Sequence, residues 1–260
     1  MVDSKPYIIT FCSGKSGVGK SILAANIASK LAENRIHTLL CDAHHSSPTL
    51  HRLIGVEPLY FWEDLIDKHF PLHMITHEVA PHLTLLASNS SPTKIVTSDE
   101  FKASLNTIIT NIDTECIIFD CNSGASSEII DCCAISDVIF VVLTDEPSSV
   151  IDAYGLIKII QTKVYQSHIC LIINNVIDHE DADDTTKKLN MATTHFLSSE
   201  FESLGFIPYD RAVRSSIIQQ QLLCSYSPDS GAAIALHELS SLVHEMVVGK
   251  LSALQSTSSL

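Results

Sequence analysis

The chain has 260 residues, of which 45% are hydrophobic and 18% charged, so it can bury a substantial core as one large α/β domain or two small ones. Its formal net charge of −14 argues against a broad grip on nucleic acid or on anionic lipid, since both require a basic surface. No segment has the apolar core of a signal peptide or the length of a membrane span. We therefore expect a cytoplasmic protein.

The first apolar run, residues 7–12, predicts a strand, and residues 21–32 have the apolar spacing of a helix. Between them lies a Gly-x-x-x-x-Gly-Lys-Ser sequence, which is typical of a phosphate-binding P-loop. In such a loop backbone N–H groups surround the phosphate oxygens, the lysine reaches the β- and γ-phosphates, and the serine hydroxyl faces Mg²⁺. The residues expected to contact a nucleotide here are Gly14, Lys15, Ser16, Gly17, Val18, Gly19, Lys20, Ser21 and Ile22.

Strands and helices are expected to alternate along the rest of the chain. The expected strands are residues 38–42, 83–87, 116–120, 138–144, 169–174 and 204–208. The expected helices are residues 61–68, 100–111, 148–162, 183–201 and 231–248. This alternation predicts a mostly parallel sheet with helices on both faces. The chain has no repeats or linker-like stretches, so we expect one α/β domain over residues 1–250 and a flexible tail at 251–260.

Polar residues end several of the expected strands, and in a parallel α/β sheet these ends carry the functional loops. Asp120 closes an apolar strand in the Walker B manner, which predicts that it holds Mg²⁺ directly or through water. Gly124, four residues on, can supply a backbone N–H near the γ-phosphate. Asn174 has the amide needed to read an adenine edge, but a turn asparagine explains the pattern equally well.

The eight cysteines favour buried free thiols over disulfides or a metal site. Most lie in or beside apolar runs, where cysteine behaves as a small hydrophobic residue. Cys132 and Cys133 are adjacent, and no Cys-x-x-Cys occurs.

The P-loop and three later segments together resemble the MinD/ParA family of ATPases. Lys15 follows the first glycine of the loop, as in the deviant Walker A sequence Lys-Gly-Gly-x-Gly-Lys-Ser/Thr of that family. Residues 144–154, Thr-Asp-Glu-Pro-Ser-Ser-Val-Ile-Asp-Ala-Tyr, are similar to the T-P-E-P-T-S-x-x-D-A-Y segment of MinD and its flagellar relatives. Residues 204–210 and 227–230 resemble the flagellar-number regulators FlhG, also called FleN. The likeness extends over residues 7–248.

The resemblance implies a P-loop NTPase that binds ATP or ADP with Mg²⁺ and forms an ATP-dependent sandwich homodimer. Lys15 would reach across to the phosphates of the partner, and Asp42 would act through a metal-bound water. The implied metal residues are Ser21, Asp42 and Asp120, and the implied adenine residues are Asn174, Pro208 and Asp210. The resemblance also implies protein partners such as a flagellar GTPase or a transcription regulator.

The chain departs from the family at its first switch, Asp-x-Asp-x-Gly. His44 stands where the second aspartate orients the attacking water, and Ser46 stands where the glycine would be. Phosphoryl transfer depends mainly on positioning and electrostatics, so this change bears on hydrolysis. A neutral His44 imidazole could act as a base near pH 7, or it could be inert and leave a protein that binds nucleotide but hydrolyses it very slowly.

The last helix differs from the basic, membrane-binding helix of MinD-like proteins. Lys250 is the only basic residue after Arg214, whereas interfacial helices usually carry lysine or arginine on the polar face. Core packing is therefore favoured, and contact with the inner membrane stays open.

Four functions remain open. The first is an ATP-switched regulator of the placement or number of a structure such as flagella, and the second is a hydrolysis-deficient nucleotide-binding scaffold. The third is a metal-cluster P-loop protein, for which Cys121 is the only cysteine near enough to consider. The fourth, DNA partition of the ParA type, is disfavoured by the acidic balance.

Overall fold

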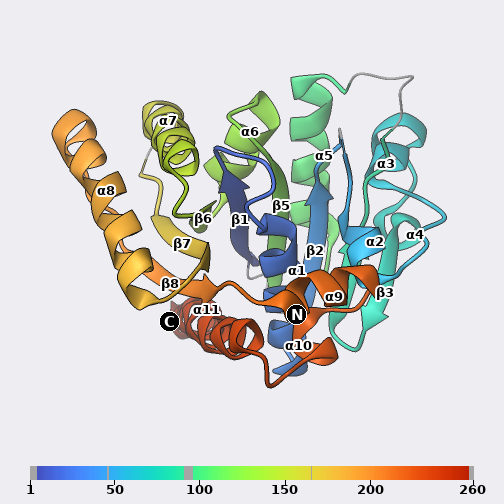
Figure 1. The fold of residues 1–260 in the computed structure, drawn as a ribbon. Coiled ribbons are helices and arrows are strands. Elements are labelled where there is room, and N and C mark those ends of the chain that lie inside the picture. The colour runs from blue at the N-terminus through green and yellow to red at the C-terminus, as the bar shows by residue number, and fades with distance from the viewer. Residues whose placement is uncertain (1–4, 46, 91–95, 165, 258–260) are drawn as a thin grey trace.

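A computed structural model describes residues 5–45, 47–90, 96–164 and 166–257. Its centre is an eight-stranded sheet in the order β3-β4-β2-β5-β1-β6-β7-β8, covered by helices on both faces (Figure 1). All neighbouring strands are parallel except β3 and β4, which pair antiparallel at one edge. The expected single α/β domain with a mostly parallel sheet is confirmed.

Each strand expected from the sequence is present. The strands are β1 Tyr7–Ser13, β2 Thr38–Ala43, β3 Thr76–Ala80, β4 Leu83–Leu86, β5 Cys116–Ser123, β6 Val138–Leu143, β7 Ile169–Val176 and β8 Ser203–Pro208. The central strands β1, β2 and β6 are buried along their whole length, as continuous apolar runs in a parallel sheet require. The sequence analysis missed β3, because this half-exposed edge strand has no apolar run to mark it.

The helices are α1 Lys20–Glu33, α2 Leu50–Ile54, α3 Trp62–Lys68, α4 Leu72–Ile75, α5 Ser98–Asn111, α6 Ser127–Ile135, α7 Pro147–Lys163, α8 His179–Leu197, α9 Arg211–Ile218, α10 Leu223–Tyr226 and α11 Gly231–Thr257. α8 begins four residues before its expected start, because the Asp178 carboxylate accepts the N–H groups of Glu180 and Asp181 and caps the helix there. α11 continues past its expected end, so most of the expected tail is helical, and residues 258–260 lie outside the described residues.

Two hydrophobic layers hold the sheet. The first contains apolar residues of α1, α10 and α11, and the second contains those of α5, α6, α7 and α8 together with Trp62 of α3. Because helices cover both faces, the loops that follow β1, β2 and β5 gather at the carboxyl end of the sheet.

The C-terminal helix packs on the core, as its sequence predicted. Leu239, Val243 and Val247 of α11 are buried. The Lys250 ammonium donates to Asp137 at 2.6 Å and lies 5.4 Å from the centre of the Tyr7 ring, so it joins this helix to the beginning of β1. In the part of the chain that the structure describes, no helix is both long and apolar enough to cross a membrane.

Candidate nucleotide-binding site

The loop between β1 and α1 has a backbone that only glycine accommodates at two positions. Gly17 and Gly19 have φ angles of 79° and 95°, in the left-handed region that other residues avoid. A Cβ at Gly19 would lie 2.2 Å from the Asn174 side-chain nitrogen, and one at Gly14 would lie 2.1 Å from the Asp152 carbonyl. The loop is thus closely packed between β7 and α7, and its N–H groups can form the concave anion site expected of a P-loop.

Lys20 lies beneath this loop at the first position of α1, with 7% of its surface exposed. Its ammonium donates to the Ser13 hydroxyl at 2.8 Å, and that hydroxyl donates to the Lys15 carbonyl at 2.6 Å. Burial lowers the pKa of Lys20, whereas the nearby Asp120 opposes that change. The ammonium is therefore held in place before any phosphate arrives. Ser13, which the sequence analysis did not single out, fixes its position.

Asp42 and Asp120 lie opposite each other on the adjacent strands β2 and β5, and both side chains are fully buried. Burial, reinforced by the Asp120 charge, raises the pKa of Asp42 to about 8 although three backbone N–H groups stabilise its charge. Burial raises the pKa of Asp120 to about 6, against the opposing effects of Ser21 and Lys20. Ionisation of both buried acids beside a single ammonium is costly unless a further cation joins them, and the raised pKa values of both carboxyls reflect this cost.

This arrangement fits a divalent cation. Among the described residues, no group lies at the distance and angle of a hydrogen bond to either carboxylate oxygen of Asp120. The nearby Ser21 hydroxyl accepts a hydrogen bond from the Thr49 hydroxyl, with 3.4 Å between the two oxygens. Carboxylate and hydroxyl oxygens are the ligands that Mg²⁺ prefers. The structure therefore brings Ser21, Asp42 and Asp120 together as the sequence predicted, and their ligation of Mg²⁺ stays a prediction.

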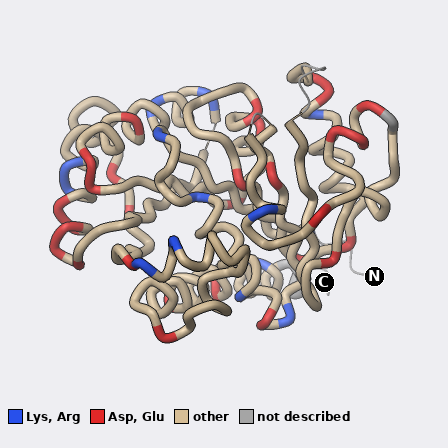
Figure 2. Tube along the Cα trace, turned by 45° about the vertical axis from the view of Figure 1, so that its right-hand side comes forward, with Lys and Arg blue, Asp and Glu red and all other residues tan. Residues whose placement is uncertain are grey.

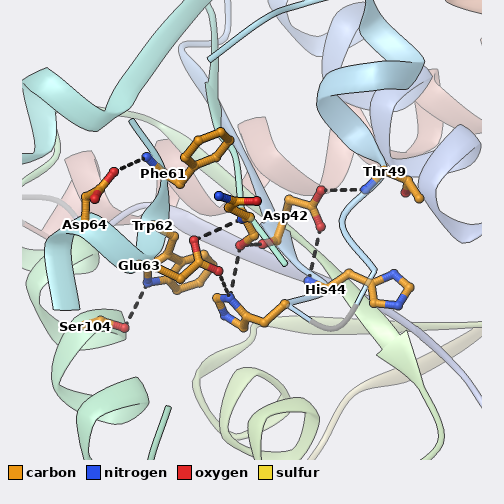
Figure 3. Close-up of polar contacts among 11 residues, drawn as sticks. Asp42, His44, Thr49, Phe61, Trp62, Glu63, Asp64 and Ser104 are labelled. Carbon is orange, nitrogen blue, oxygen red and sulfur yellow. Dashed lines mark hydrogen bonds and ion pairs between the residues drawn. The ribbon is translucent and has the colours of Figure 1, made fainter. Parts of the chain in front are cut away.

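His44 follows β2 and lies half-buried near the lysine. Its backbone N–H donates to the Asp42 carboxylate at 3.1 Å, and its ring points away from Glu63 and Trp62 (Figure 3). Burial, with smaller effects of Lys20 and His45, lowers the pKa of the His44 imidazole. The ring is therefore neutral at pH 7 and able to accept a proton. Ser46, the other departure from the family pattern, lies outside the described residues.

Lys15 is engaged within its own chain. Its ammonium forms an ion pair with Glu146 and donates to the Ser148 hydroxyl at 2.8 Å. Glu146 and Ser148 stand at the beginning of α7, in the segment that carries the family resemblance. The reach of Lys15 to a partner subunit stays a prediction.

The remaining expected contacts lie around the P-loop. The Asn174 side-chain nitrogen donates to the Val18 carbonyl at 2.7 Å, so this amide supports the loop and leaves its oxygen for other contacts. Gly124 has a φ angle of 91°, but its N–H donates to the Ser13 carbonyl at 2.9 Å instead of pointing to a phosphate. Pro208 ends β8, and the Asp210 carboxylate caps α9 by accepting the Ala212 N–H at 2.8 Å.

The cysteines are buried in the core, and Cys12, Cys41 and Cys121 stand next to Ser13, Asp42 and Asp120 in sequence. All eight are free and buried, which confirms the expectation of buried thiols. Cys121, considered for a metal cluster, lies in the core between β5 and α6 next to Cys132. The described residues contain no group of three or more His, Cys, Asp or Glu side chains that could hold a metal ion within one chain.

A parallel sheet with this glycine loop at its central strand defines a P-loop nucleotide-binding protein. Residues 9–223 match the CobQ/CobB/MinD/ParA nucleotide binding domain, and the chain belongs to this family. It is 24% identical over 233 residues to the antiactivator FleN of Pseudomonas aeruginosa, with 88% of this chain and 82% of FleN covered. It is also 24% identical over 242 residues to the flagellum site-determining protein YlxH of Helicobacter pylori, with 90% and 81% covered.

Among solved structures, the fold is similar to that of the septum site-determining protein MinD of Pyrococcus horikoshii in complex with Mg-ADP. The TM-score is 0.78 at 19% identity, with 94% of this chain and 98% of that chain covered. The resemblance inferred from the sequence motifs is confirmed at the level of the family.

Proposed function

We propose that the protein is a regulatory ATPase that dimerises when it binds ATP and controls the placement or number of a cellular structure such as flagella. The observation that carries the proposal is the buried Lys20 beside the paired acids Asp42 and Asp120, beneath a loop with two left-handed glycines. The flagellar part is supported by the names of two relatives, FleN and YlxH, at 24% identity.

In this proposal Lys20 and the loop N–H groups bind the phosphates, while Ser21, Asp42 and Asp120 hold Mg²⁺. The bound metal ion neutralises charge on the phosphate oxygens. The adenine would lie against Asn174 and the loop that contains Pro208 and Asp210. Asp210 is fixed for this role because its second carboxylate oxygen accepts the Ala232 N–H at 3.3 Å.

His44 decides whether this site hydrolyses ATP. Its neutral imidazole can accept a hydrogen bond from water at the mouth of the site and orient it for attack. The alternative is a silent scaffold in which the imidazole makes no such contact. Phosphate release from MgATP by the full chain, His44→Ala and His44→Asp separates the two, with Lys20→Ala as the blank.

We expect slow release by the full chain and, because general bases contribute roughly 100-fold or more, a drop of that order in His44→Ala. Equal rates for the full chain and His44→Ala, with a large gain in His44→Asp, would support the scaffold instead. An adenine nucleotide that fails to bind the full chain at millimolar concentration would contradict both forms.

Dimerisation is tested by light scattering with MgADP and with a non-hydrolysable ATP analogue. We expect a doubling of mass with the analogue alone, and no doubling in Lys15→Ala, because the released Lys15 would contact the partner's phosphates. A full chain that stays monomeric with both nucleotides would remove dimerisation from the proposal.

A DNA-partition role has less support. The chain carries 30 acidic against 16 basic residues, and apart from the adjacent Lys187 and Lys188 the Lys and Arg residues stand singly in the sequence (Figure 2). Non-specific DNA binding depends on clustered phosphate contacts. We therefore infer that its partners are proteins, such as a flagellar GTPase or a transcription regulator, and we expect no retention on non-specific duplex DNA at physiological salt.

A further inference from the structure

The described residues 42–45 and 47–50, from the end of β2 to the beginning of α2 and called segment 42–50 below, are joined by one side chain. The Asp42 carboxylate accepts the backbone N–H groups of His44 at 3.1 Å, Thr49 at 3.0 Å and Leu50 at 3.1 Å. These bonds connect the buried acid of the nucleotide site to both ends of the segment. A displacement of the segment would therefore move His44 and disturb the contacts of Asp42.

Three other elements hold this segment from outside. The His45 Nδ1 lies 2.7 Å from a Glu63 carboxylate oxygen in the first turn of α3. It also lies 3.1 Å from the Ser88 hydroxyl, which donates to the Asp42 carbonyl at 2.5 Å. The second Glu63 oxygen accepts the Asn89 N–H at 3.0 Å. The His45 and Glu63 side chains are 18% and 14% exposed, so water screens this pair only weakly.

The geometry determines the tautomer of His45. A carboxylate accepts only, so the proton of the imidazole lies on Nδ1. The other ring nitrogen, Nε2, is buried, and no partner for it occurs among the described residues.

The His45 ring contacts the protein's only tryptophan. The centres of the His45 and Trp62 rings are 5.3 Å apart, and His45 and Phe101 are 5.6 Å apart, both edge to face. Trp62 is fully buried, and its indole N–H donates to the Ser104 hydroxyl of α5 at 2.9 Å (Figure 3). Movement of His45 would therefore change the surroundings of Trp62 and with them its fluorescence emission.

We propose that His45 and Glu63 are positioning residues that hold segment 42–50 for nucleotide binding and transmit occupancy of the P-loop to Trp62. This inference rests on the proposed function, because it concerns the same site. Neither side chain touches the phosphate loop or the paired acids directly. They act through the Ser88 hydroxyl, which lies between His45 Nδ1 and the Asp42 carbonyl, and through the backbone of the segment.

The test is Trp62 emission of the full chain on addition of MgADP, with binding measured separately by calorimetry. His45→Leu keeps apolar volume between the rings but removes the donor to Glu63, and His45→Asn keeps an N–H donor near the Nδ1 position. Glu63→Gln removes the charge and keeps the shape, so it serves if His45→Leu proves unstable. The matched control is His195→Leu on the exposed face of α8.

We expect MgADP to shift the Trp62 emission of the full chain, His195→Leu and His45→Asn. His45→Leu and Glu63→Gln should bind MgADP about tenfold more weakly and also lose at least half of the emission change at saturating nucleotide, because the transmitted contact is gone. A purely structural role would lower thermal stability in these variants while leaving the emission change at saturating nucleotide intact, and that result would overturn the proposal.

Calorimetry and Trp62 emission together distinguish a failure of the proposed function from a failure of the positioning role. If calorimetry detects no MgADP binding to the full chain, the proposed function fails, and this inference fails with it. If MgADP binds the full chain but Trp62 emission does not change, or changes equally in His45→Leu, only the positioning role is overturned.

Discussion

Two loops meet at the carboxyl end of the sheet, where the nucleotide site lies, and different parts of the chain determine their shapes. The P-loop between β1 and α1 is shaped by its own backbone, through the left-handed Gly17 and Gly19. The segment between β2 and α2 is shaped by side chains, since His45 reaches Glu63 and Ser88 supports the Asp42 carbonyl. The first loop is locally encoded, and the second depends on residues 18 to 46 positions away in sequence.

This difference separates binding from control. A loop whose backbone is set mainly by glycines, with the Asn174 amide as its support, presents its anion site in one geometry. A loop held by a few hydrogen bonds can exchange them, because each contributes only about 1–3 kcal/mol when a charged group takes part. The P-loop is therefore suited to grip the nucleotide, and the second segment is suited to respond to it. Variants of the two loops test this difference between the P-loop and the segment that follows β2.

Removal of the Lys20 charge should have the largest effect. Lys20→Ala is expected to weaken MgADP binding about 100-fold or more, because charge-assisted bonds to phosphate contribute roughly 3 kcal/mol. Calorimetry measures the change. The control is Lys30→Ala, on the same helix, where the lysine pairs with Glu33 at 2.7 Å and should not influence binding. Equal affinity of the two variants would mean that the nucleotide binds elsewhere.

Alanine substitution of the two loop glycines tests whether the backbone alone shapes the P-loop. Both adopt left-handed φ angles, which cost other residues about 1–2 kcal/mol. Nothing lies within 4 Å of a Cβ at Gly17, whereas a Cβ at Gly19 would collide with Asn174. Urea unfolding should show a loss of about 1 kcal/mol in Gly17→Ala and of about 2–3 kcal/mol in Gly19→Ala. Equal losses would show that close packing against Asn174 contributes nothing.

The same contrast explains what the sequence could predict. The central strands were predictable because their apolar runs are long and uninterrupted, as in β6. The positions of Lys20, Asp42 and Asp120 followed from the rule that loops at the carboxyl ends of parallel strands come together. The Gly-x-x-x-x-Gly-Lys-Ser spacing encodes its own loop, so no distant residue was needed to recognise it.

What the sequence could not predict depends on contacts between distant residues. The half-exposed edge strand β3 is a strand because it pairs with β4, and its own residues carry no apolar alternation. The hydrogen bond from the Gly124 N–H to the Ser13 carbonyl could not be predicted, because Gly124 follows β5 and Ser13 ends β1, and the two are more than 100 positions apart in sequence. His45 and Glu63 are ordinary surface residues in the sequence, and only the fold buries them against each other.

The paired acids predict a gain in stability when a functional charge is removed. The pKa of Asp120 rises from 3.8 to about 6 on folding, so at pH 7 the buried charge costs about 3 kcal/mol. Asp120→Asn should therefore raise the Tm of the nucleotide-free, metal-free protein by about 6–10 °C while it weakens Mg-nucleotide binding.

The pH dependence of that gain has a definite sign. As pH rises from about 4 to about 6, the unfolded chain ionises at Asp120 before the folded protein does, so the parent chain loses stability across this window. The advantage of Asp120→Asn should thus vanish below about pH 4 and be complete above about pH 6. Asp137→Asn is the matched control and should lower the Tm at neutral pH, because the Asp137 carboxylate accepts from Lys250 at 2.6 Å and from the Ile8 N–H at 2.8 Å.

The smallest effect is expected at the contact between Ser104 of α5 and Trp62, whose ring lies against His45. Ser104→Ala leaves the buried Trp62 N–H without its partner, which should lower the free energy of unfolding by about 1–2 kcal/mol and shift Trp62 emission. Thr107→Ala on the exposed face of the same helix removes only a local bond to the Ala103 carbonyl and should change stability by less than about 0.5 kcal/mol. MgADP affinity decides how far the two loops are independent. Because the P-loop is shaped by its own backbone, Ser104→Ala should leave that affinity within about threefold of the parent chain, a difference below about 0.7 kcal/mol. A larger loss would show that the phosphate loop also depends on the packing around Trp62.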